Sequence, residues 1–269
     1  MIPFIVLFTS LSVKSFVLHA IPIGLAAFLL AGGLGPVVLT LAFFFLVPSL
    51  AMGHLYKRGR SAKSALLAGF VIILAQLLLE MVLFSMLFDI DLKAELAALL
   101  ADNFKQLEAA NLFEPGWAAN AANEISGMVM NMLPMLLLTS SFLFAIIAHG
   151  LSRRALRTVG FEAPALPEAK TWRVSKSMIV YLVVALIASY AMSEETGGYW
   201  WIAVMNLVPI LELAFVVQAI GFAFFLADAM KASKVLPVLA CVPILLFAQI
   251  SFIVGLVDAA FPLRKFIVK

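Results

Sequence analysis

The sequence contains little charge and almost no cysteine. Of its 269 residues, 12% are charged and 64% are hydrophobic, whereas soluble domains contain about 25% charged and about 45–50% apolar residues. This composition argues against a soluble domain, because only lipid solvates so much apolar surface. The single cysteine, Cys241, excludes an intrachain disulfide and leaves no thiol cluster that could bind a metal.

Enzyme and cofactor motifs are also missing. The chain has no HExxH, no Gly-x-Ser-x-Gly and no phosphate-binding glycine loop. We therefore expect no ATPase of its own, no metal site and no cofactor, although an intramembrane enzyme with scattered catalytic residues stays open. The net charge of +3 is small, and no basic patch is interleaved with aromatic residues. A nucleic-acid partner is therefore not expected.

Long apolar runs dominate the chain. A helix that crosses the hydrocarbon core needs about 20 apolar residues. Seven stretches approach this length: Phe16–Gly33, Pro36–Gly53, Ser64–Phe88, Ile125–His149, Lys176–Met192, Tyr199–Met230 and Val235–Val257. The glycines and proline at 32–36 predict a turn that makes 16–53 a helical hairpin. Met1–Val13 is either an interfacial segment or a short, tilted eighth span. The predicted fold is an all-α, polytopic membrane bundle over residues 1–269, with seven or eight transmembrane helices.

Loop charge predicts the orientation of the bundle. Twelve basic residues fall in the loops 57–63 and 150–176 and in the turn 231–234. Alternating spans place all three on one side, which the positive-inside rule assigns to the cytoplasm. The same alternation places the C-terminal tail outside, although the tail contains Arg264, Lys265 and Lys269. We keep this topology because twelve basic residues outweigh three.

The opposite side is acidic and contains an amphipathic segment. Residues 89–124 contain seven acids and two lysines. Within them, leucines and Phe104 recur at helical spacing over Leu92–Leu107, which predicts an amphipathic helix that lies on the outer surface or caps the bundle. The sequence Glu114-Pro115-Gly116-Trp117 then predicts a turn.

Polar residues inside the apolar runs are the candidate site. A carboxylate at the bilayer centre costs at least about 2.5–3.5 kcal/mol on insertion scales. Glu212 lies 13 residues beyond Tyr199, which at about 1.5 Å per residue places it near the midplane. It either borders a polar cavity or is a structural acid, protonated or paired with a neighbouring helix. The other candidate substrate-binding residues are Gln76, Glu80, Asn131 and Asn206, for which interhelical hydrogen bonding is the alternative.

Several short segments together resemble the YybS-type bacterial membrane proteins. These segments are 45–59, which contains His54; 206–221, which contains Gln218 and Gly221; and 255–265, which contains Gly255, Asp258 and Arg264. The resemblance implies a multi-pass protein of the bacterial inner membrane. That family is in turn loosely similar to the substrate-capturing components of energy-coupling-factor transporters, which bind a ligand from outside and dock on a shared energising module.

The function predicted is a substrate-binding or transport component without its own ATPase. The five polar residues would line an outward-facing cavity for a small-molecule ligand, and the helix at Leu92–Leu107 would act as its lid. A protein partner would dock on the basic cytoplasmic loops 57–63 and 150–176. The alternative is a non-catalytic scaffold or assembly subunit of a membrane or envelope complex, in which buried polar residues only bond helices together.

Overall fold

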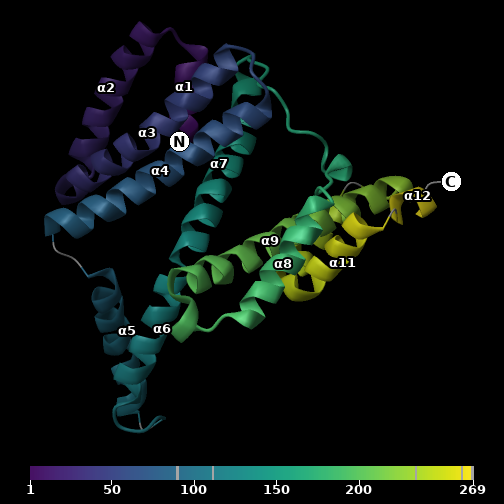
Figure 1. The fold of residues 1–269 in the computed structure, drawn as a ribbon. Helices are drawn as coiled ribbons and strands as arrows, with labels where there is room; N and C mark the ends of the chain where they lie inside the picture. The colour runs from purple at the N-terminus through teal and green to yellow at the C-terminus, as the bar shows by residue number, and fades with distance from the viewer. Residues whose placement is uncertain (89–90, 111, 234, 262, 268–269) are drawn as a thin grey trace. The chain divides into compact units, whose positions relative to one another are not determined.

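The computed structural model describes residues 1–269 except 89–90, 111, 234, 262 and 268–269. Its regular elements are helical, and the chain divides into two compact units (Figure 1). Unit 1 comprises Met1–Ser126 and Leu136–Leu166, and unit 2 comprises Gly127–Met135 and Pro167–Lys269. Asp89, Lys234 and Lys269, which the charge pattern includes, lie outside the described residues.

The helices of unit 1 begin with a hairpin and a short helix beside it. The elements up to residue 158 are α1 (Ile2–Ser10), α2 (Val13–Leu30), η1 (Gly32–Leu34), α3 (Gly35–Lys57), α4 (Ala62–Phe88), α5 (Leu92–Ala109), α6 (Trp117–Asn131) and α7 (Leu133–Thr158). The end of α6 and the start of α7, within Gly127–Met135, belong to unit 2. Gly32, at φ 55°, begins the turn between α2 and α3, so the predicted hairpin is confirmed.

The helix α1 lies along the second half of α3. The hydroxyl of Ser49 donates to the Met1 carbonyl, and a Cβ added at Gly53 would lie 2.8 Å from a ring carbon of Phe8. With nine residues, α1 extends only about 13 Å. It is therefore too short to be the eighth span.

Five helices of the described residues are long and apolar enough to cross a membrane: Val13–Leu30, Gly32–Lys57, Ala62–Leu87, Leu133–Thr158 and Gly198–Ala229. The predicted count of seven is not confirmed, for two reasons. The helix α8 (Ser177–Ala191) has only 15 residues. The stretch 235–257 is divided between α10 (Val235–Leu246) and α11 (Ala248–Ala260), which are bent by 117° from one another.

In unit 2, α11 packs parallel to the long helix α9 (Glu194–Ala229). Contacts advance together along the two helices: a Cβ at Gly255 would meet the carbonyl of Phe215, and Asp258 bonds to Gln218. Figure 1 shows α9 and α11 side by side. The chain enters α10 from the C-terminal end of α9, and α11 then runs in the same direction as α9. The helices α10 and α11 therefore form a hairpin and not one straight span.

The C-terminal helix α12 (Leu263–Ile267) corrects the predicted position of the tail. The Arg264 guanidinium donates to the carbonyls of Lys170 and Trp172, at 2.7 and 3.1 Å. Both residues belong to the basic loop 150–176. The tail therefore lies at the same end of α9 as the loop, and the α10–α11 hairpin is the physical reason: it reverses the chain without crossing to the opposite end.

The amphipathic segment folds as expected in its local structure. The helix α5 covers the predicted 92–107, and Gly116, at φ 89°, forms the turn before α6. Trp117 stacks on Phe113, with ring centroids 3.8 Å apart. Glu108 accepts hydrogen bonds from the backbone N–H groups of Gly116 and Ala118, at 2.8 and 3.0 Å. The location of α5 on the outer side of the membrane and its role as a lid stay predictions.

The first testable consequence concerns Gly255. Gly255→Ala places a Cβ 1.8 Å from the Phe215 carbonyl oxygen, so α9 and α11 must separate, at a cost of about 1–3 kcal/mol. We expect a lower midpoint when the purified protein is heated in detergent and its monodisperse fraction is measured. Gly150→Ala in α7 is the control, because nothing lies within 4 Å of its added Cβ. An unchanged midpoint for Gly255→Ala would contradict the close packing.

A second testable prediction concerns the side chain of Glu108. The two backbone N–H donors lower the pKa of its carboxyl. Because the folded-state pKa is the lower one, the bonds stabilise the α5–α6 turn above the unfolded-state pKa, and this stabilisation is lost as pH falls through the folded-state pKa. Hydrogen exchange at the Gly116 and Ala118 amides should therefore show protection that acid removes. Glu108→Gln should weaken this protection and its acid dependence, and retention of both would show that the carboxylate is not the acceptor.

Candidate functional site

A buried ionic cluster joins α9, α11, α12 and the loop before α8. Asp258 and Arg264 are 4% and 5% exposed, and Gln218 is 1% exposed. Arg264 Nη2 lies 2.7 Å from Asp258 Oδ2, and its Nε lies 3.2 Å from Oδ1. The Gln218 amide donates to Asp258 and accepts from the backbone N–H of Val174 at 2.8 Å. Each charge is thus compensated where water is largely excluded.

A glycine and an aromatic ring pack closely on this cluster. Gly221 faces the loop so closely that an added Cβ would lie 3.1 Å from the Ala169 carbonyl oxygen. The Arg264 guanidinium carbon lies 5.1 Å from the ring centroid of Phe225, within the range of a cation–π contact. Five of the six residues of the predicted family motif, Gln218, Gly221, Gly255, Asp258 and Arg264, therefore meet in one place.

His54, the sixth, does not join them. It is exposed on α3 in unit 1. The buried histidine of that unit is His149, which is 2% exposed and has its Nδ1 2.6 Å from the hydroxyl oxygen of Tyr56. Tyr56 and His149 both lie near the predicted cytoplasmic ends of their spans, which was the available sequence signal for this contact.

The five predicted substrate-binding residues are divided between the two units. Gln76 and Glu80 lie on α4 in unit 1, and Asn131, Asn206 and Glu212 lie in unit 2. Gln76 Nε2 donates to the Phe44 carbonyl at 3.0 Å, while its buried Oε1 has no partner among the described residues. Glu80 is partly buried. Neither unit by itself contains all five residues, and the predicted common cavity stays a prediction.

Asn206 bridges the interruption between α6 and α7. Its side-chain oxygen accepts from the Met135 N–H at 2.8 Å, and its Nδ2 donates to the Asn131 carbonyl at 2.7 Å and to the Ile202 carbonyl at 2.8 Å. These bonds satisfy backbone groups that a helix break leaves without partners. The amide of Asn206 is therefore fully used in holding the chain, and Asn131 contributes its backbone carbonyl to this arrangement.

Glu212 differs from these residues. It lies two turns beyond Asn206 on α9 and is partly buried. In the part of the chain that the structure describes, its carboxylate has no hydrogen bond and no ion pair. On α11, Ser251 is 8% exposed and lies one turn before Gly255 on the side that packs on α9. Since Gly255 meets Phe215 in a parallel pair, Ser251 lies at about the level of residue 211.

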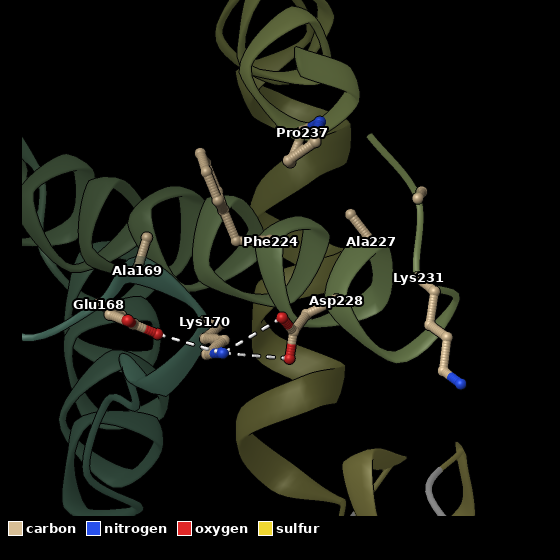
Figure 2. Close-up of a pocket in the computed structure, with 9 residues that line it drawn as sticks. Glu168, Ala169, Lys170, Phe224, Ala227, Asp228, Lys231 and Pro237 are labelled. Carbon is tan, nitrogen blue, oxygen red and sulfur yellow. Dashed lines mark hydrogen bonds and ion pairs between the residues drawn. The ribbon is translucent and has the colours of Figure 1, made fainter. Parts of the chain in front are cut away.

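A cavity of about 550 Å³ opens at the C-terminal end of α9, and Figure 2 shows its lining. The Lys170 ammonium lies 3.1 Å from a carboxylate oxygen of Glu168 and 3.1 Å from one of Asp228. Both bonds raise the pKa of Lys170, Glu168 having the larger effect. The Lys231 ammonium points away from Asp228 (Figure 2). The charged groups of this cavity largely neutralise one another, and none of the five predicted site residues lines it.

The described residues contain no group of three His, Cys, Asp or Glu side chains that could hold a metal ion. Two polar features of α9 stand out among the described residues: a satisfied ionic cluster at the level of Gln218, and an unpaired carboxylate, Glu212, nearer the middle of the helix.

The long apolar helices and their paired buried charges define a multi-pass membrane protein. The profile of a family described as "Predicted membrane protein (DUF2232)" matches residues 2–259. The chain belongs to this family. No match was found among curated proteins or among solved structures. The resemblance to energy-coupling-factor capture components therefore stays a prediction.

The ionic cluster yields a prediction on stability. Arg264→Met leaves Asp258 buried without its counter-charge, and we expect a loss of about 3–5 kcal/mol. Asp258→Leu combined with Arg264→Met removes both charges and should be less destabilising than Arg264→Met alone. The measurement is thermal unfolding in detergent of the wild-type protein, Asp258→Leu, Arg264→Met and the double variant, treated as a double-mutant cycle. Additive losses would show that the two side chains act independently.

Proposed function

We propose that the protein is a substrate-binding or transport component without its own ATPase, and that its ligand binds beside Glu212 in unit 2. One observation carries this proposal. Glu212 is a partly buried carboxylate in the middle of a membrane-spanning helix, and it lacks any polar partner among the described residues.

The cost of burial supports a role other than packing. A structural acid in a membrane is expected to pair with another side chain or with backbone donors. Asp258 shows what such pairing looks like in this protein, because Arg264 and Gln218 occupy both of its oxygens. Among the described residues, no donor on α9 or α11 forms such a bond with Glu212. Water or a ligand would supply the donors.

Two helix interruptions lie near the level of Glu212. The first, between α6 and α7, bonds to Asn206. The second, at Phe247, precedes Gly255 by eight residues and so lies at about the level of residue 207 on α9. Interrupted helices at membrane depth are tolerated where the backbone is buried in protein or lines a water-filled cavity, and in transporters they mark binding sites.

Ser251 supplies a second polar group to this site. Its hydroxyl forms no hydrogen bond within the described residues, and it faces α9 at about the level of Glu212. A carboxylate and a hydroxyl at about the same level of unit 2 favour a ligand that presents a cation or hydrogen-bond donors. Energy for transport would come from a partner, since the sequence contains no phosphate-binding loop.

The scaffold alternative rests on a different observation. The side chains of Asn206, Gln218 and Arg264 bond segments of the chain to one another, as expected if buried polar groups serve only to hold helices together. Under this alternative no water reaches Glu212. The two functions therefore differ in whether water reaches Glu212.

Thiol labelling tests this difference. Glu212→Cys in a Cys241→Ala background should react with a charged, membrane-impermeant thiol reagent, because the reactive thiolate forms in water. Leu207→Cys is the control, since Leu207 is 43% exposed on the same helix and would face lipid. We expect Glu212→Cys to react at least about tenfold faster. Equal rates would refute the hydrated site and favour the scaffold.

Native mass spectrometry provides the matching test of ligand binding. A small molecule that co-purifies with the wild-type protein should be lost from Glu212→Gln at near-normal expression, because the amide cannot balance a cation. Retention of that molecule by Glu212→Gln would place its site elsewhere.

A further inference from the structure

Two basic loops that are far apart in the sequence converge at one end of unit 1. The loop after α3 and the end of α7 are joined by the bond between Tyr56 and His149. Tyr56 and Leu156 also belong to one buried cluster, against which Leu55 and Phe161 pack. This contact brings the segments 57–63 and 153–163 together within the unit.

The surface formed in this way has a large excess of positive charge. Its exposed basic side chains are Arg58, Arg60, Lys63, Arg153, Arg154 and Arg157. Across the described residues, none of these six forms an ion pair with a carboxylate. Glu162 is the acid within this surface. Lys57 is not included, because its ammonium donates to the Leu11 carbonyl and lies 4.4 Å from the ring centroid of Phe8.

A small cavity lies within this basic surface. It has a volume of about 110 Å³ and is lined by Arg153, Arg157, Phe161, Glu162 and Ala163. Arg153 Nε donates to the Ala163 carbonyl at 3.2 Å, which orients the guanidinium and leaves its terminal nitrogens available. The two arginines are one helical turn apart on α7, a spacing at which both can contact one phosphate group.

An apolar stripe leads from the span to this surface. Phe142 and Leu143 are 40% and 50% exposed on α7, and Ile146 is partly buried. At about 100° per residue, these three lie on the side of the helix that contains Arg153 and Arg157. In a membrane this face contacts acyl chains, which places the arginines at the headgroup level. A ligand that brings acyl chains to this face and a phosphate to the arginines is a phospholipid.

We propose that this basic end of unit 1 binds an anionic phospholipid, with its phosphodiester held between Arg153 and Arg157. The surrounding positive charge repels the ammonium group of a zwitterionic headgroup and favours a headgroup without one. If the basic residues served only to orient the chain in the membrane, removal of any two of them would affect lipid binding equally.

The experiment uses the full chain, purified in detergent and titrated with phosphatidylglycerol or phosphatidylcholine under native mass spectrometry. The wild-type protein should prefer phosphatidylglycerol, and Arg153→Gln with Arg157→Gln should weaken that binding roughly 10- to 30-fold. The control, Arg173→Gln with Lys176→Gln, removes the same charge from the unit 2 part of the same loop and should change binding less than about twofold.

Three results would overturn the proposal: no preference between the lipids, an equal loss in the control, or inorganic phosphate binding as tightly as phosphatidylglycerol. The last would identify a site for free phosphate. Arg153 and Arg157 are exposed, so the double variant should fold. If its thermal midpoint falls, Arg157→Gln alone is titrated in its place, and unchanged phosphatidylglycerol binding by that variant would equally refute the site.

Discussion

A guanidinium and a carboxylate removed from water require compensation for every charge, and unit 2 is arranged around that requirement. Asp258 receives Arg264 and Gln218, and Arg264 in turn donates to two loop carbonyls. The pair can be this deep only because Gly255 lets α11 approach the backbone of α9. The contacts of Gly255 with Phe215 and of Asp258 with Gln218 show that the two helices run in the same direction, and this direction makes α10 and α11 a hairpin.

The sequence predicted the membrane class and the local helices well, because apolar runs and turn residues are local signals. It did not predict the hairpin, since the apolar run 235–257 contains no break in polarity at Phe247. Pro243 within α10 was the available local hint. A second hint was the position of Arg264 and Lys265 on the side that the positive-inside rule disfavours. The hairpin removes that conflict.

The candidate site was predicted less completely. Burial of Asn206 and Gln218 followed from their positions in apolar runs, but their partners are backbone groups at Met135 and Val174, which side-chain patterns do not reveal. Gln76 and Glu80 are one helical turn apart on α4, and they belong to a different unit from Glu212. Residue spacing along one helix cannot show which helices meet, so the sequence could not show that the five residues belong to two units.

Asn206 has a mechanical consequence. One amide bonds both ends of the interruption at Asn131–Met135 while its own backbone belongs to α9. A rotation or slide of α9 must therefore either break these bonds or carry the α6–α7 junction along. Asn206 thus couples the position of α9 to the α6–α7 junction within unit 2.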